Sequence, residues 1–259
     1  MNLEAARSLL FVPGDRPDRF AKAEAGGADG VVLDLEDAVG AGHKAEAREH
    51  VRAWLAEGHP AIVRVNAPGT PWFADDVTAV GSQAVAVMVP KAEDPSALPQ
   101  GVPVIPLLET ALGIARANSV CAAPAVVRPA FGSVDLAAQL GVDHRSHEAL
   151  RHARSAVVLA AAAAGRPGPI DGVTTAVDDA AALSADIAEA VLLGFTAKLC
   201  IHPRQVEAVR RGFAPSAADV EWARGVLAAA SEGSVAVYEG QMVDRPVVLR
   251  AEAVLARAE

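Results

Sequence analysis

Eight short apolar runs recur along the 259-residue chain, and most of them are separated by segments with polar residues at helical spacing. The runs are rich in Val, Ile and Leu, which is typical of parallel strands that are covered on both faces. They occupy residues 8–12, 30–35, 61–66, 84–89, 102–108, 126–131, 169–173 and 197–201. A strand returning every ~25–30 residues, in a chain close to the ~250 residues of one (β/α)8 barrel, favours a closed barrel. We therefore predict an α/β fold consisting of a single TIM barrel.

Helices are expected over residues 17–26, 44–57, 111–122, 146–164, 178–193 and 203–211, with Ser133 and Asp178 as N-caps. An open, doubly wound sheet is the alternative fold. The G-x-G-x-x-G pattern that marks the ligand-binding turn of such a sheet follows none of the strands.

Residues 215–259 lie beyond the eighth strand and its helix. Their pattern predicts a helix at 217–231, a short strand at 234–238, a turn and a last helix at 247–258. We expect residues 1–259 to form one domain, with 215–259 as a C-terminal helical extension that packs on the barrel or on a neighbouring subunit.

The charge balance is acidic, with 23 Lys and Arg against 32 Asp and Glu and a net charge of −9. No basic run interleaved with aromatics appears, so no nucleic-acid partner is expected. The N-terminal residues lack the features of a signal peptide, and no uncharged apolar stretch reaches the ~18 residues of a membrane span. Cys121 and Cys200 lie in apolar surroundings and are expected to be reduced core residues. These features predict a cytoplasmic protein with no membrane partner.

Polar residues gather where the predicted strands end, and in a barrel these ends share one mouth. Charged side chains buried there need a partner or an ion. The residues concerned are Asp34, Glu36, Asp37, Arg64, Asn66, Lys91, Glu109, Asp135 and His202.

Glu109 and Asp135 follow adjacent predicted strands, so their carboxylates are expected to lie close together. Two neighbouring carboxylates repel unless a cation lies between them, and magnesium takes such oxygen ligands together with water and substrate. A salt bridge from one of them to Lys91 or Arg64 is the alternative, and the spacing alone does not choose between the two.

The basic residues also have two interpretations each. Arg64 offers a planar fork for a substrate carboxylate, or it neutralises Asp34 or Glu36. Lys91 suggests a Schiff base with a ketone substrate, although acidic neighbours favour its unreactive protonated form.

Two further groups of polar residues are ambiguous. One face of the first predicted helix carries three basic residues, Arg16, Arg19 and Lys22. They either bind phosphate groups or form an ordinary solvated surface. His202 contacts substrate or bonds to backbone. The segment 147–152 does not match the H-E-x-x-H zinc motif, because Arg151 stands at the second histidine position.

Eight short motifs are spread over nearly the whole chain. They are RSLLFVPG at 7–14, LDLEDAV at 33–39, VRVN at 63–66, VPK at 89–91, LETA at 108–111, FGSVDL at 131–136, KLCIHP at 198–203 and EGQMVD at 239–244. With these motifs the chain resembles the citrate lyase β-subunit-like proteins, relatives of malyl-CoA and citramalyl-CoA lyases in the magnesium-dependent HpcH/HpaI aldolase superfamily.

The resemblance implies a TIM barrel that assembles as a homotrimer and binds Mg²⁺ through Glu109 and Asp135. It implies that Arg64 clamps a keto-acid carboxylate, with Glu36 orienting groups nearby. It also implies that Asp244 is the general acid/base, delivered by the C-terminal segment of a neighbouring subunit. From its sequence context alone, Asp244 belongs to an ordinary turn.

The resemblance further assigns substrate contacts to Gly132 and Ser133. It places Lys22 and Arg16 near the phosphates or pantetheine of coenzyme A, and His202 near the thioester. One position departs from the family pattern: Phe11 stands where some relatives carry a Tyr that touches coenzyme A.

The implied activity is a retro-Claisen cleavage, or the reverse condensation, of a 3-hydroxyacyl-CoA such as citryl-, citramalyl- or malyl-CoA. The products would be a keto acid (oxaloacetate, pyruvate or glyoxylate) and an acyl-CoA. A magnesium-dependent aldolase on free keto acids is one alternative. A citrate lyase β subunit that acts only with α and acyl-carrier subunits is another.

Overall fold

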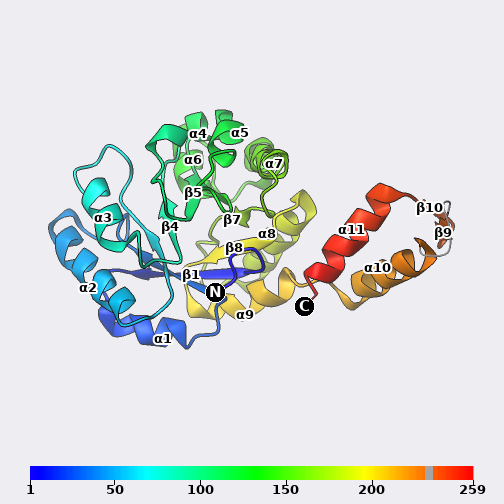
Figure 1. The fold of residues 1–259 in the computed structure, drawn as a ribbon, viewed down its shortest axis with the longest axis horizontal. Coiled ribbons are helices and arrows are strands. Elements are labelled where there is room, and N and C mark those ends of the chain that lie inside the picture. The colour runs from blue at the N-terminus through cyan, green and yellow to red at the C-terminus, as the bar shows by residue number, and fades with distance from the viewer. Residues whose placement is uncertain (231–235, 259) are drawn as a thin grey trace. The chain divides into compact units, whose positions relative to one another are not determined.

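The computed structural model describes residues 1–230 and 236–258, and its central feature is a closed barrel of eight parallel strands (Figure 1). The strands follow one another around the barrel in chain order, and β1 closes it by pairing Ser8 with Lys198 of β8. They are β1 (Ser8–Pro13), β2 (Gly30–Asp34), β3 (Ile62–Arg64), β4 (Ala86–Val89), β5 (Val104–Leu108), β6 (Ala130–Phe131), β7 (Ile170–Asp171) and β8 (Ala197–Cys200). All eight predicted strands are confirmed, although β6 and β7 are only two residues long.

The helices that follow the strands form the outer layer. They are α1 (Phe20–Glu24), α2 (Lys44–Ala56), α3 (Phe73–Val80), α4 (Ala111–Ala115), α5 (Ala117–Cys121), α6 (Ser133–Leu140), α7 (His147–Ala163), α8 (Ala180–Leu193) and α9 (Pro203–Gly212). Short 3-10 turns form η1 (Pro17–Arg19), η2 (Ala41–His43) and η3 (Pro95–Ala97).

Some helix predictions were wrong in detail. The sequence analysis assigned no helix over α3 or α6, although it named Ser133 as an N-cap, and it expected one helix at 111–122 where α4 and α5 are separated at Arg116. Ser133 is the first residue of α6, and Gly132 is its N-cap. The cap of α8 is Asp179, one residue beyond the predicted Asp178, because its side chain accepts a hydrogen bond from the Ala182 N–H at 2.9 Å.

Aliphatic side chains fill the barrel interior. Alternate residues of a strand point to opposite faces, so each strand sends one set inward and the other toward the helices. The buried inward set consists of Leu9, Val32, Ile62, Ala86, Met88, Ile105, Leu107, Ala130, Ile170, Ala197 and Leu199. The packed interior leaves the carboxyl ends of the strands as the place for polar groups.

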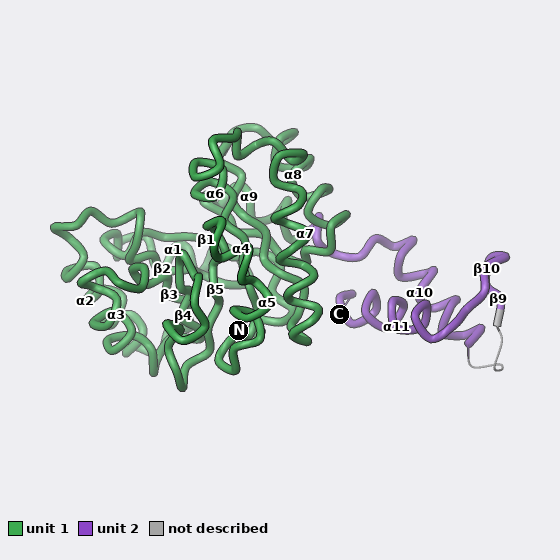
Figure 2. Tube along the Cα trace, turned by 90° about the horizontal axis from the view of Figure 1, so that it is seen from above, with its two compact units in different colours: residues 1–210 green, residues 211–259 purple. Residues whose placement is uncertain are grey.

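The chain divides into two compact units, Met1–Arg210 and Arg211–Glu259 (Figure 2). In the second unit, α10 (Ala217–Ala230) packs against α11 (Arg245–Ala256), and β9 (Ala236–Tyr238) pairs antiparallel with β10 (Gln241–Val243). Glu239 and Gly240 both have positive φ, as a two-residue hairpin turn requires. The sequence analysis expected only a turn where β10 forms.

The packing predicted for residues 215–259, on the barrel or on a neighbouring subunit, stays a prediction. Among the described residues, no helix is both long and apolar enough to cross a membrane.

Candidate active site

Charged side chains from five consecutive strand ends meet at one mouth of the barrel, around a cavity of about 410 Å³. Asp34 and Arg64 are the last residues of β2 and β3, and they are also direct partners in the register of the two strands. Glu109 follows β5, and Asp135 lies in the first turn of α6. These four line the cavity together with Phe11, Gly132 and Ser133.

Arg64 is held by two carboxylates. Its Nε and Nη2 donate to the two carboxylate oxygens of Asp34 at 2.7 and 2.6 Å, and its Nη1 lies 3.1 Å from Glu36 Oε2. Burial alone would lower the pKa of Arg64, but the bond to Asp34 holds it above its ordinary value. The neutralising role that the sequence offered for Arg64 is therefore present, and the guanidinium also faces the cavity, 4.7 Å from the Phe11 ring.

Lys91 contacts three carboxylates. Its backbone N–H donates to Glu109 Oε1 at 3.0 Å, while its Nζ lies 2.5 Å from Glu36 Oε1 and 3.2 Å from Asp135 Oδ2. Burial lowers the pKa of Lys91, but the bond to Glu36 and the nearby carboxylates raise it well above its ordinary value. A Schiff base needs the neutral amine, so this environment disfavours that chemistry.

Glu109 is the most perturbed acid of the mouth. It is only 6% exposed, and burial together with the charges of Glu36 and Asp135 raises its pKa to about 8, against the opposing charge of Lys91. Gly132 makes room for it, because a Cβ at Gly132 would lie 2.5 Å from Glu109 Cβ. A divalent cation beside Glu109 would favour the charged carboxylate, against the burial and the neighbouring negative charges that raise this pKa.

The structure shows a salt bridge between Lys91 and Asp135, which the sequence analysis gave as the alternative to a metal site. The same mouth also contains carboxylates suited to a metal. Glu36 Oε2 is buried and accepts no hydrogen bond from the described residues, although Arg64 lies near it. In residues 1–230 and 236–258, no three His, Cys, Asp or Glu side chains are placed to hold a metal ion together. An ion here would have two carboxylates and otherwise water or substrate oxygens, a set that suits magnesium.

The basic residues expected near coenzyme A do not line this cavity in the described part of the chain. Arg16 forms a two-pronged ion pair with Asp18 at 2.9 Å, and both side chains are exposed. Lys22 is exposed on α1. His202 accepts a hydrogen bond from the Arg204 N–H at 3.2 Å, which is the backbone contact that the sequence offered as its alternative role.

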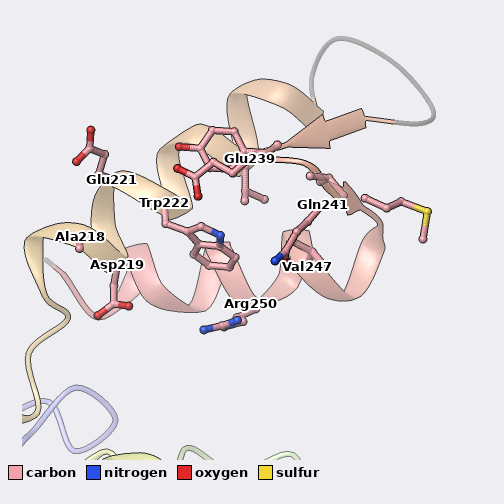
Figure 3. A pocket seen from close by; sticks show the side chains of 12 residues that line it. Ala218, Asp219, Glu221, Trp222, Glu239, Gln241, Val247 and Arg250 are labelled. Carbon is pink, nitrogen blue, oxygen red and sulfur yellow. The ribbon is translucent and has the colours of Figure 1, made fainter.

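Asp244 lies in the second unit, at the start of α11. It is exposed, and its Oδ1 accepts a hydrogen bond from the Val247 N–H at 3.2 Å, so it is the N-cap of this helix. Val243, the preceding residue, lines a separate cavity of about 610 Å³ (Figure 3). There the Arg250 guanidinium lies 4.6 Å from the Trp222 ring, between α11 and α10.

Two buried lysines that support the mouth were given no role in the sequence analysis. Lys44 Nζ donates to the backbone carbonyls of Leu35 and Glu36 at 2.8 and 2.7 Å. Lys198 Nζ donates to Asp171 Oδ2 at 2.8 Å and to the Gly172 carbonyl at 2.7 Å. The one available signal was a lysine inside an otherwise apolar strand, as at Lys198.

The chain matches the model of the HpcH/HpaI aldolase/citrate lyase family over residues 7–105 and 98–203. A citrate lyase subunit beta-like protein from Mycobacterium tuberculosis is 42% identical, with 100% of this chain and 98% of the relative covered. A (3S)-malyl-CoA thioesterase from Cereibacter sphaeroides is 35% identical over 98% of this chain and 94% of its own length.

The chain is also similar in sequence and fold to solved structures. The protein CitE from M. tuberculosis, in complex with magnesium, acetoacetate and coenzyme A, has 39% sequence identity and a TM-score of 0.86, with 99% of each chain covered. A citrate lyase beta subunit of the same organism, complexed with oxaloacetate and magnesium, has 38% identity and a TM-score of 0.74, and it covers 83% of this chain and 100% of its own.

Proposed function

We propose that this chain, which belongs to the HpcH/HpaI aldolase/citrate lyase family and is a lyase, uses Mg²⁺ to cleave or form a carbon–carbon bond of a 3-hydroxyacyl-CoA. The observation that carries the proposal is the carboxylate pair of Glu109 and Asp135 beside Arg64, at the mouth of the barrel. Solved relatives bind magnesium with acetoacetate and coenzyme A, or with oxaloacetate, which supports this choice of metal and substrate class.

Glu109 and Asp135 would hold the magnesium. When bound there, the ion supplies Lewis acidity to the hydroxyl and carboxylate oxygens of the substrate. The buried position of Glu109, with its pKa raised to about 8, is the feature of this chain that fits a bound cation.

Arg64 would fix the carboxylate of the keto-acid half. Its bonds to Asp34 lock the guanidinium in one orientation, so the substrate meets a positioned donor instead of a mobile side chain. Glu36 helps to orient Arg64, and Gly132 and Ser133, at the start of α6, would contact the same end of the substrate.

Asp244 would transfer the proton. In the cleavage direction, the substrate hydroxyl loses its proton. The bond between the carbon that carries this hydroxyl and the carbon next to the thioester then breaks. The electron pair stays on the acyl-CoA as an enolate, and Asp244 of a neighbouring subunit in a homotrimer protonates that carbon. The hydroxyl proton passes to solvent, and Asp244, left as a carboxylate, takes one proton back from solvent, so the keto acid and the acyl-CoA together contain the atoms of the substrate.

Coenzyme A would lie along the segment from Arg16, which precedes the η1 turn, to Lys22 on α1, in place of the single helix face that the sequence predicted. Arg16 and Lys22 would meet its phosphates or pantetheine, and His202 would lie near the thioester. Both cations are exposed, so they are accessible to a ligand.

The role of Asp244 can be separated from its capping role. Asp244→Asn keeps a good N-cap acceptor but cannot exchange a proton, whereas Asp244→Ala loses both. We expect both variants to lose ~10²–10⁴-fold in kcat, and only the alanine variant to lose stability. If Asp244→Asn keeps full activity, the assignment of proton transfer is wrong.

A thioesterase is the second candidate, because the relatives from C. sphaeroides that carry this name are 35% identical over nearly the whole chain. The products distinguish the two activities. A lyase converts malyl-CoA to glyoxylate and acetyl-CoA without releasing a free thiol, whereas a thioesterase releases malate and free coenzyme A.

The proposed contact of Arg16 and Lys22 with coenzyme A has its own test. Neutralising Arg16 and Lys22 should raise KM for a CoA ester and leave kcat nearly unchanged. An unchanged KM would favour an aldolase on free keto acids.

A further inference from the structure

The side chain of Lys91 already supplies a positive charge to the carboxylates of the barrel mouth. Its Nζ lies 2.5 Å from Glu36 Oε1 and 3.2 Å from Asp135 Oδ2, so the ammonium bridges the two acids. Asp135 is one of the two residues that would hold magnesium. The ammonium therefore lies where it competes with a metal ion for the same oxygen.

The backbone of Lys91 places it there. Its φ of 49° lies in the left-handed region, which costs free energy for a residue other than glycine. In this conformation, the backbone N–H of Lys91 donates to Glu109 Oε1 at 3.0 Å. One residue thus touches both proposed metal ligands, one through its backbone and one through its side chain.

The two ends of the Lys91 bridge differ in burial. The Glu36 side chain is 7% exposed, whereas the side chains of Asp135 and Lys91 are 35% and 37% exposed. Charge pairs that face water are weak and easily exchanged, and buried partners are lost only at a high cost. The contact with Asp135 is therefore the one that can be broken.

We propose that Lys91 is an internal counter-cation that competes with the metal for Asp135 and thereby weakens metal binding. On metal binding, Nζ leaves Asp135 and stays with Glu36, while the backbone N–H stays on Glu109. This inference rests on the proposed metal site, and it adds a residue that sets the affinity of that site.

The charges predict the direction of the effect. A divalent ion near Asp135 is repelled by an ammonium a few ångströms away, and removing the ammonium removes this repulsion. Because both groups are partly exposed, solvent reduces the gain. We expect a charge-free side chain at this position to tighten metal binding on the order of tenfold.

The experiment is a titration of the full-length protein with Mn²⁺, with free Mn²⁺ followed by electron paramagnetic resonance and no substrate present. The variants are Lys91→Met, which removes the charge at similar length, and Lys91→Arg, which keeps the charge. Lys91→Gln is the substitute if the methionine variant does not fold, because it keeps a donor for Glu36. Lys22→Met is the matched control, since it removes an exposed lysine on α1.

The proposal predicts that Lys91→Met or Lys91→Gln binds Mn²⁺ about tenfold more tightly, and that Lys91→Arg and Lys22→Met stay near the wild-type Kd. Binding by the neutral variants that is equal to or weaker than the wild type overturns the proposal while the metal site stands. If the wild-type protein binds no Mn²⁺, the proposed metal site fails and the inference fails with it.

Discussion

At the scale of single residues, the absence of a side chain at Gly132 determines where Glu109 can lie. A Cβ on Gly132 would come within 2.5 Å of Glu109 Cβ and 2.6 Å of its Oε2. Contacts this short would force one of the two residues to move. Glu109 is buried among closely packed neighbours, so its side chain has little room to shift. The acid is therefore positioned by its neighbour as well as by the strand that precedes it.

We predict that Gly132→Ala destabilises the fold by about 1–3 kcal/mol and weakens Mn²⁺ binding, because Glu109 is pushed from its place. Thermal unfolding and a metal titration measure the two effects. Gly40→Ala is the control, since Gly40 has an ordinary φ of −64° and its added Cβ would lie 3.8 Å from the nearest atom. Wild-type metal affinity in Gly132→Ala would contradict the assignment of Glu109 as a ligand.

Burial sets the chemistry of the two cysteines. Both are free and buried, and loss of solvation raises the pKa of each thiol to about 12. Their folded-state pKa lies above the value of a free thiol, so the stability linked to them is complete below pH ~8.5. It is lost as the pH rises from there through about 12.

We predict that neither Cys121 nor Cys200 reacts with a thiol reagent at pH 8 in the native protein, and that both react once it is unfolded in guanidinium. Counting the thiols that react with Ellman's reagent, with and without denaturant, checks this. Fast reaction of either thiol in the native state would show that its surroundings open readily to solvent.

At the scale of elements, β7 and β8 are joined by a buried ion pair as well as by backbone hydrogen bonds. Asp171 and Lys198 are direct register partners, and their side chains are 0% and 2% exposed. Lys198 also donates to the carbonyl of Gly172, and Gly172 borders the cavity. The pair thus connects a two-residue strand to the wall of the candidate site.

We predict that Lys198→Met lowers the free energy of unfolding by about 3–5 kcal/mol, because Asp171 stays buried without this partner. Denaturant titration measures the loss, and Lys22→Met, on an exposed surface, should change stability by less than about 0.5 kcal/mol. A loss below about 1 kcal/mol would mean that Arg154, which lies 3.0 Å from Asp171, satisfies the carboxylate by itself.

The sequence predicts elements better than it predicts side-chain pairing. The eight strands were predictable because each is an apolar run that is buried on both faces. The helices α3 and α6 were missed because each is eight residues long and gives too short a pattern for its period to be recognised.

Within the site, the sequence could predict that Asp34, Arg64, Glu109 and Asp135 share one mouth, because parallel strands end on one side. It could not predict the triple contact of Lys91, which depends on a backbone turn with φ of 49° at a residue that rarely adopts it. The sequence also left two interpretations open for Arg64 and for Lys91. Only the structure shows that Arg64 pairs with Asp34 and Glu36 and still faces the cavity.

At the scale of the whole molecule, the proposed catalytic groups are divided between the two compact units. Glu109, Asp135 and Arg64 belong to Met1–Arg210, whereas Asp244 belongs to Arg211–Glu259. If Asp244 acts on a neighbouring subunit, each proposed active site contains groups from two chains, and the assembly is required for turnover.

We predict that two inactive variants complement each other. Glu109→Ala lacks the proposed metal ligand and Asp244→Ala lacks the proposed acid, so subunits that are mixed and allowed to exchange should regain part of the wild-type rate. Some mixed interfaces then combine an intact barrel with an intact Asp244. Activity that stays absent after subunit exchange has been shown, for instance by native mass spectrometry, would place both groups within one chain.

The most direct test of the central claim is the metal dependence of keto-acid release. Purified protein is incubated with malyl-, citramalyl- and citryl-CoA in Mg²⁺, in EDTA, and in EDTA followed by excess Mg²⁺, and the keto acid is trapped as its phenylhydrazone. We predict release from at least one ester in Mg²⁺, none in EDTA, recovery when the metal is restored, and no release by Glu109→Ala or Asp135→Ala under any condition. Full activity in EDTA, or in either variant, would contradict the claim that these two carboxylates work through a shared divalent ion.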